Sequence, residues 1–106
     1  MHGGAVDRIA CEFGDAVRKL LGNRVRSVTL FGSYARGEQT EGSDRDVLVV
    51  VDEYDRSARE LVTDVAVRML DTYGTLFGCL VWGAKEWESK RRYPLGLNIA
   101  KEGVPI

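Results

Sequence analysis

Residues 30–38, LFGSYARGE, and residues 42–50, GSDRDVLVV, decide the fold of this 106-residue chain. Residues 25–31 are short and rich in β-branched side chains, so they are predicted to form a strand that stops at a turn. The apolar run over residues 46–52 predicts a second strand, and the polar, glycine-containing segment before it predicts a loop. A turn and a pair of aspartates are therefore expected at neighbouring strand ends.

The turn after the first predicted strand has the features of an anion-binding site. A strand that ends at Gly32 and Ser33 and opens into a helical turn points unpaired backbone N–H groups outward. Glycine lets a phosphate approach closely because it has no β-carbon, and the Ser33 hydroxyl adds a donor. Arg36, one helical turn on, would stabilise phosphate charge, and the alternative is a surface arginine paired with Glu38 or Asp44. By itself, a Gly-Ser pair after a strand is more often an ordinary turn.

Asp44 and Asp46 are the second chemical element of the sequence. Side chains at positions i and i+2 of a strand project to the same face, so both carboxylates can converge on one or two hard cations. Such carboxylates repel one another unless a cation neutralises them. By itself, an Asp-x-Asp pair is more often the polar start of a strand with surface aspartates. Here ten residues separate Ser33 from Asp44, which is enough chain to bring the aspartate pair back beside the turn. Together the two elements are specific.

Helical periodicity flanks these strands. Apolar residues at spacings of three and four predict a first helix ending near Gly22 and a second over residues 56–73, closed by Gly74. With a third strand over residues 75–82, the predicted fold class is α/β (α+β), a small mixed β-sheet flanked by helices, in a single domain over residues 1–106. Two further helices are expected over residues 84–91 and 95–102. The apolar positions are Val6, Ile9, Ala10, Phe13, Val17, Leu20 and Leu21 in the first helix and Leu61, Val65, Met69 and Thr72 in the second.

Composition argues against several functions. The formal net charge is −1, which argues against DNA binding. Cys11 and Cys79 have no CxxC spacing and His2 is the single histidine, so no zinc site or disulfide is expected, and both thiols should be buried and reduced. The longest aliphatic run is far below the roughly 18 residues of a membrane span, and no apolar signal region is seen, so the expected location is cytoplasmic.

The two segments resemble the DNA-polymerase-β-type nucleotidyltransferase superfamily, whose mark is Gly-Ser, about ten residues and then Asp-x-Asp. Residues 30–50 are most similar to the minimal nucleotidyltransferases, and the C-terminal run PLGLNIAKEGV is similar to the ends of such chains. The resemblance implies a polymerase-β-like fold in which Asp44 and Asp46 are catalytic and hold Mg²⁺ against a nucleoside triphosphate, with ATP as the expected nucleotide. Gly32 and Ser33 would hold its terminal phosphates while a hydroxyl attacks the α-phosphorus.

The resemblance also implies a partner protein. Minimal nucleotidyltransferases act on a small helical HEPN protein, frequently a toxin, which they neutralise by binding or by adenylylation. A chain of 106 residues has no second domain to grip an acceptor, so the acceptor site is expected on another subunit. The sequence leaves open whether the domain forms homo-oligomers.

Two features depart from the family pattern. Active members usually carry a third carboxylate on a later strand, but the predicted third strand has none, so Glu86 or Glu88 would have to fold back. Asp52 is out of reach, roughly 20 Å from Asp46 at about 3.3 Å per residue. Arg45 stands where an apolar residue is common and must reach solvent or an acid. Two functions stay open: an Mg²⁺-dependent enzyme that transfers AMP from ATP, and a weak or inactive module that binds nucleotide or a HEPN partner.

Overall fold

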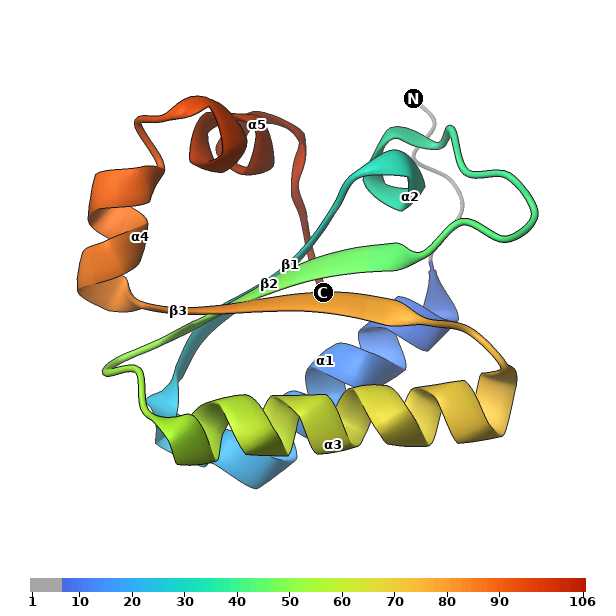
Figure 1. Cartoon of the computed structure of the whole chain (residues 1–106), viewed down its shortest axis with the longest axis horizontal. Helices are drawn as coiled ribbons and strands as arrows, with labels where there is room; N and C mark the ends of the chain where they lie inside the picture. Colours follow the sequence, from blue (N-terminus) through green and yellow to red (C-terminus); the bar gives the residue numbers. More distant parts are fainter. Residues whose placement is uncertain (1–6) are drawn as a thin grey trace.

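A four-stranded mixed sheet forms the centre of the structure, a computed structural model that describes residues 7–106 (Figure 1). The strands are β1 (Val25–Phe31), β2 (Arg45–Val51), β3 (Phe77–Gly83) and β4 (Val104–Pro105), in the spatial order β3-β2-β1-β4. β1 pairs antiparallel with β2 and with β4, whereas β2 and β3 run parallel. A parallel pair needs a crossover connection, and the long helix between β2 and β3 supplies it. The mixed sheet with flanking helices confirms the predicted fold class.

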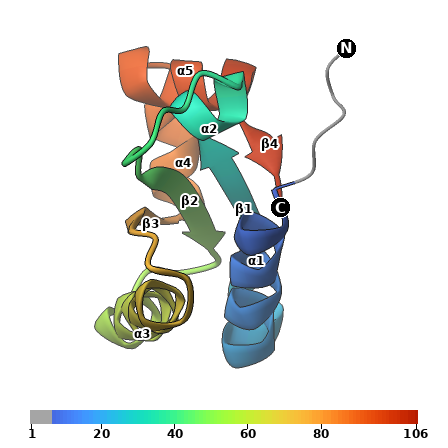
Figure 2. The same cartoon turned by 90° about the vertical axis from the view of Figure 1, so that its right-hand side faces the viewer.

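Helices α1 (Arg8–Leu21) and α3 (Arg56–Tyr73) cover one face of the sheet (Figure 2). Asp7 and Asp55 cap these helices, each accepting a hydrogen bond from the backbone amide three residues on. The Phe13 ring of α1 stacks on a phenylalanine of β3, with ring centroids 4.5 Å apart. The fully buried side chains of this core include Phe13, Val17, Val28, Val47, Val49, Val51, Val62 and Val65.

Helices α4 (Ala84–Lys90) and α5 (Pro94–Glu102) cover the opposite face, and the short helix α2 (Ser33–Arg36) lies at the end of β1 (Figure 1). Trp82 and Ile99 pack here against the second apolar face of β2. Because β2 is buried on both faces, its sequence is a continuous apolar run rather than an alternating one. This second core holds α5 close to the turn that follows β1.

Three of the strands differ from their predicted form. β3 begins at Phe77 and ends at Gly83, whereas residues 75–82 are predicted. β4 is an additional strand of two residues, and it pairs with Thr29 and Leu30 of β1. A two-residue strand has no side-chain period, so the sequence pattern could not indicate it. The predicted second strand includes Asp52, but β2 ends at Val51, and Asp52 forms an ion pair with Arg26.

The helices follow the predicted bounds closely. Val6 lies outside the described residues, and α1 begins at Arg8. Leu20 and Thr72, both placed on apolar faces by the prediction, are exposed. The buried residues of α3 are Ala58, Val62, Val65 and Met69. Only Val65 and Met69 belong to the predicted apolar face, so the buried face is rotated relative to the prediction. Within residues 7–106, no helix combines the length and the apolar character that crossing a membrane requires.

Cys11 and Cys79 are free thiols, but both are half-buried rather than buried, contrary to expectation. Burial, and then the charge of Asp46, raises the pKa of the Cys79 thiol to about 12. Cys79 therefore remains protonated near neutral pH and is a poor metal ligand. His2 lies outside the described residues.

Candidate active site

The turn between β1 and α2 is built on Gly32. This residue has φ 76° and ψ −155°, a conformation that favours glycine. Its carbonyl oxygen accepts hydrogen bonds from the amides of Ala35 and Arg36, both at 3.1 Å, which closes one helical turn. The amides of Ser33 and Tyr34 have no acceptor within so short a helix, so they are the donors that a bound anion would meet.

Asp46 brings a carboxylate directly to this turn. Phe31 and Asp46 are register partners in the β1–β2 ladder, so the Asp46 side chain stands beside Gly32. A β-carbon added at residue 32 would overlap Asp46 Oδ2, which means that the carboxylate fills the space where a side chain would lie. The structure therefore brings together the predicted turn and the second predicted aspartate.

Gly78 faces Asp46 from the other neighbouring strand. Asp46 and Gly78 are register partners in the parallel β2–β3 ladder, and a β-carbon added at Gly78 would lie 3.1 Å from Asp46 Oδ1. The position from which a third carboxylate would reach the pair is thus occupied by a residue without a side chain. Within residues 7–106, no group of three or more histidine, cysteine, aspartate or glutamate side chains is placed to hold a metal ion.

The electrostatics of the aspartate pair suit a cation. Asp46 is half-buried and Asp44 is exposed. Burial raises the pKa of Asp46, the negative charge of Asp44 raises it further, and Arg36 lowers it. A divalent cation would relieve the repulsion between the two carboxylates. Mg²⁺ is usually bound by one or two carboxylates together with substrate phosphates, so this donor set fits it without a third acid.

Arg36 projects from the end of α2 and forms two ion pairs. Its Nε lies 2.8 Å from Glu38 Oε1, and its Nη1 lies 3.2 Å from Glu102 Oε1. These hydrogen bonds, that to Glu38 first, raise the pKa of Arg36. The pairing with Glu38 is the predicted alternative for this residue, whereas Glu102 is far away in sequence and was not foreseen. All three side chains are well exposed, so both pairs are weak and Arg36 remains free to exchange partners.

Arg45 points away from the site, to the α1 side of the sheet. It is 9% exposed, and its Nε donates to Asp7 Oδ2 at 2.9 Å while its Nη1 donates to Thr75 Oγ1 at 2.7 Å. Its guanidinium carbon also lies 4.1 Å from the centroid of the Tyr34 ring. Arg45 is expected to reach solvent or an acid, and it reaches an acid, the residue that caps α1. Arg45 thus connects the start of β2 to α1 and α2.

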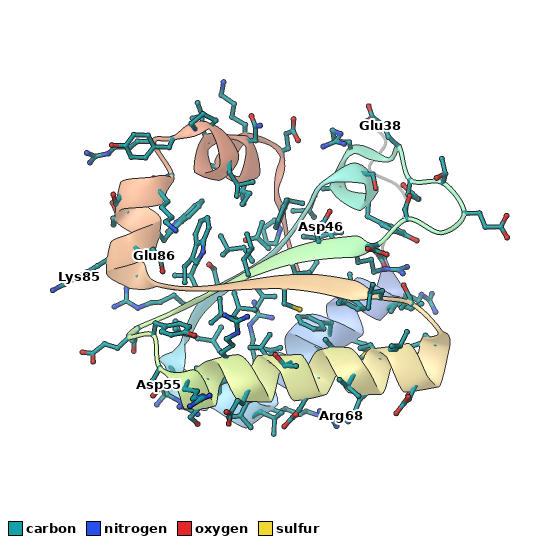
Figure 3. All side chains as sticks on the ribbon, in the orientation of Figure 1. Glu38, Asp46, Asp55, Arg68, Lys85 and Glu86 are labelled. Carbon is teal, nitrogen blue, oxygen red and sulfur yellow. The ribbon has the colours of Figure 1, made fainter. Side chains whose placement is uncertain are left out.

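Neither Glu86 nor Glu88 folds back to the aspartate pair. Both lie on α4, which follows the end of β3, whereas Asp46 lies at the start of β2, which runs parallel to β3. Figure 3 shows Glu86 on α4, well away from Asp46. Each glutamate instead faces a nearby cation: Glu86 Oε2 lies 2.8 Å from Lys90 Nζ of the same helix, and Glu88 Oε2 lies 3.7 Å from Nη1 of Arg91, the residue that follows α4.

Solved structures share this arrangement of sheet and helices. A proposed nucleotidyltransferase from Sulfolobus solfataricus matches with a TM-score of 0.60 and 24% identity over 92% of this chain and 76% of that one. A toxin–antitoxin protein crystallised with AMP-PNP matches with a TM-score of 0.60 and 20% identity over 89% of this chain and 69% of that one. The fold is therefore that of the nucleotidyltransferases, as the resemblance at residues 30–50 implies.

Sequence comparison assigns the chain to a family. A family model described as a nucleotidyltransferase domain matches residues 10–98, and the chain belongs to this family. A proposed protein adenylyltransferase of Methanocaldococcus jannaschii, MJ0604, is 33% identical over 93 residues, which cover 87% of this chain and 88% of that relative. The predicted family is thus confirmed.

Proposed function

We propose that this domain binds Mg²⁺ and ATP at the face formed by Gly32, Ser33, Asp44 and Asp46 and transfers AMP to a hydroxyl group of a partner protein. The observation that carries the proposal is the position of the Asp46 carboxylate, which lies against the glycine of the turn. A cation held by the aspartates and a phosphate held by the turn would be immediate neighbours. Metal and triphosphate would then bind as one unit.

Each residue of the face has a distinct role in this proposal. The amide and hydroxyl of Ser33 donate to the terminal phosphates, and Gly32 lets them approach the backbone. Arg36 exchanges its weak carboxylate partners for a phosphate, to which an arginine fork binds well. Asp44 and Asp46 are the ligands of Mg²⁺, which supplies charge neutralisation of the phosphates when bound.

The reaction transfers AMP in one displacement. The acceptor hydroxyl oxygen forms a bond to the α-phosphorus, the bond from that phosphorus to the β-bridging oxygen breaks, and pyrophosphate leaves with the electron pair. The hydroxyl proton passes to water or to a group of the acceptor, because Gly78 offers no base on the strand beside Asp46. The chain's own contribution is therefore positioning and charge stabilisation rather than proton transfer.

Several observations support ATP and a protein as the two substrates. The relative from M. jannaschii carries the name of a protein adenylyltransferase, and the toxin–antitoxin neighbour was crystallised with an ATP analogue. The described helices α1, α3, α4 and α5 pack against the sheet, and the proposal places the acceptor hydroxyl on another chain. A small helical protein of the HEPN type is the proposed acceptor, in a toxin–antitoxin pair. The cytoplasm, which supplies ATP and Mg²⁺, is the proposed location.

The transfer is tested with purified protein, Mg²⁺, ATP labelled at the α-phosphate and a purified helical protein of the HEPN type as the acceptor. Label should appear on the partner, Asp44→Asn should abolish it, and Asp64→Asn, an exposed aspartate of α3, should leave it unchanged. Labelling that survives Asp44→Asn would rule out the two-carboxylate mechanism.

The glycine at position 78 favours a second function, since a site without a general base can bind nucleotide without catalysing its transfer. In this alternative the domain is a weak or inactive module that binds nucleotide or the HEPN partner. It predicts a stable complex with the partner that forms equally well with Asp44→Asn and without nucleotide. Size-exclusion chromatography of the two proteins, with and without ATP, separates the alternatives.

A further inference from the structure

A hollow of about 240 Å³ lies beside the phosphate turn, between α2 and α5. Gly32 and Arg36 line it from the turn, and Phe31 lines it from the end of β1. Figure 2 shows the two helices next to each other on the same side of the sheet. Because Phe31 and Asp46 are register partners, the hollow lies near Asp46 as well as beside the turn. A ligand held at the turn can therefore extend into it.

The α5 wall of the hollow is one stripe of the helix. Leu95, Asn98 and Glu102 line the hollow, and their spacings of three and four residues put them on a single flank of α5. Glu102 Oε1 lies 3.2 Å from Arg36 Nη1, so the two walls meet at that end. Leu95 is seven residues away, about 10 Å along the helix axis. The Leu95 end of the hollow therefore lies away from the end at which Arg36 and Glu102 meet.

The lining has the composition of a small aromatic-ring site. Three apolar side chains line the hollow. Leu95 is 50% exposed, Phe31 is half-buried and Ile99 is buried. Pockets for whole ligands span roughly 300–1,000 Å³, so this hollow is sized for part of a ligand, such as one planar ring system. Asn98 is the uncharged polar side chain among the lining residues, and its amide offers one acceptor and donors together.

We propose that this hollow holds the base of the bound nucleotide and that Asn98 recognises adenine. An asparagine amide pairs with adenine through two hydrogen bonds, to N6 and N7, which guanine cannot match because it presents an acceptor in place of the amino group. Leu95 and Phe31 supply the apolar contact with the ring. The inference rests on the proposed function, in that a nucleotide must bind, and it identifies the residues that decide which nucleotide is used.

Two substitutions on α5 test the apolar wall. Leu95→Ser should weaken binding of ATP with Mg²⁺ by about fivefold or more, because a buried aliphatic contact with the base is lost. Leu97→Ser is the matched control, since Leu97 is 41% exposed on the same helix but does not line the hollow, and it should change the affinity by less than about twofold. Calorimetry on the full chain measures both, and circular dichroism checks that both variants remain folded.

Asn98 is tested by the choice between bases. The full chain should bind ATP more tightly than GTP, and Asn98→Ala should lower the ATP-to-GTP affinity ratio roughly tenfold, because it removes both the acceptor for adenine N6 and the donor to N7. Equal affinities for ATP in the Leu95→Ser and Leu97→Ser variants, or an ATP-to-GTP ratio unchanged by Asn98→Ala, would overturn the inference while leaving transfer from ATP intact. An altered ratio without any labelled partner would support the inference and count against the transferase. No binding of ATP at all would overturn both.

Discussion

Asp46 of β2 and Gly78 of β3 are register partners, and the Asp46 carboxylate faces a residue that has no side chain. On its other side the same carboxylate lies against Gly32. Asp46 is therefore held between two glycines: Gly32 begins the phosphate turn, and Gly78 provides no side chain on the neighbouring strand. The contact between Asp46 and Gly32 supports metal and nucleotide binding. The missing side chain at Gly78 means that the neighbouring strand provides no third carboxylate for catalysis.

Gly78→Asp should increase transfer. The new β-carbon would lie in close contact with Asp46, 3.1 Å from its Oδ1, so the added carboxylate would stand beside Asp46, where we expect it to accept the hydroxyl proton. General base catalysis contributes roughly 10²–10⁴-fold, and we expect a gain of at least about tenfold in the rate of AMP transfer. Gly78→Asn has nearly the same shape without the basic oxygen. An equal gain in both variants would show that the effect is not that of a base.

Gly32→Ala should remove nucleotide binding. Alanine at residue 32 is strained at φ 76° and its β-carbon overlaps Asp46 Oδ2, so both the turn and the carboxylate must move. Gly37→Ala is the matched control, because Gly37 has φ 71° but no neighbouring atom within 4 Å of an added β-carbon. Both variants should lose about 1–3 kcal/mol of unfolding free energy, measured in urea. Binding of ATP with Mg²⁺ should fall at least about tenfold for Gly32→Ala alone; equal affinities in the two variants would contradict this account.

The stability of the metal-free domain should fall as the pH rises through the titration of Asp46. Burial and the charge of Asp44 raise the pKa of Asp46 above its ordinary value of 3.8, so the folded chain holds this proton to a higher pH than the unfolded chain does. Between the two pKa values the folded state binds more protons, and the free energy of unfolding decreases with pH. Urea unfolding in EDTA should show this decrease in the wild type relative to Asp46→Asn. Identical pH profiles would contradict the raised pKa.

Mg²⁺ should reverse that loss near neutral pH. The ion binds the deprotonated carboxylates of the folded state, so it should stabilise the wild type at pH 7 and much less at pH 4. Thermal unfolding with and without Mg²⁺ measures the difference. Asp46→Asn should show little stabilisation at either pH, and a full response in that variant would place the ion elsewhere.

Arg45→Met should destabilise the domain by about 3 kcal/mol, because it leaves Asp7 largely buried without its cation. Asp7→Asn is a suitable partner change, since asparagine still caps α1. The double variant should be more stable than the sum of the single losses predicts, with a coupling of at least about 1 kcal/mol from urea unfolding. Strictly additive losses would show that the ion pair contributes nothing.

Much of the fold could be predicted from the sequence because its signals are local. Gly32, Gly37 and Gly74 mark real turns with positive φ, and the apolar period of α1 leads directly to its buried stripe, whereas that of α3 identifies the helix but not the line of its buried side chains. β4 escaped prediction because it depends on pairing with Thr29 and Leu30 rather than on its own two residues. The prediction that Thr72 lies on the apolar face of α3 was wrong, because the helical period alone does not determine which line of residues is buried.

In the candidate site too, residues with a local sequence signal could be predicted and residues that depend on tertiary contacts could not. Gly32, Ser33, Asp44 and Asp46 share a spacing that indicates one site, and the structure brings the glycine and Asp46 into contact. The pairing of Asp46 with Gly78 could not be predicted, because it depends on the register of two parallel strands joined by an eighteen-residue helix. Asp7 and Glu102, the partners of Arg45 and Arg36, lie far from them in sequence and carry no local signal.

The central claim is that Asp46 and the Gly32 turn form one metal–nucleotide site. Calorimetric titration of ATP with and without Mg²⁺ tests it most directly, in the wild type, in Asp46→Asn and in the surface control Asp64→Asn. We predict that Mg²⁺ tightens ATP binding at least about tenfold in the wild type and in the control, and that Asp46→Asn abolishes this gain. An equal Mg²⁺-dependent gain in all three proteins would contradict the claim.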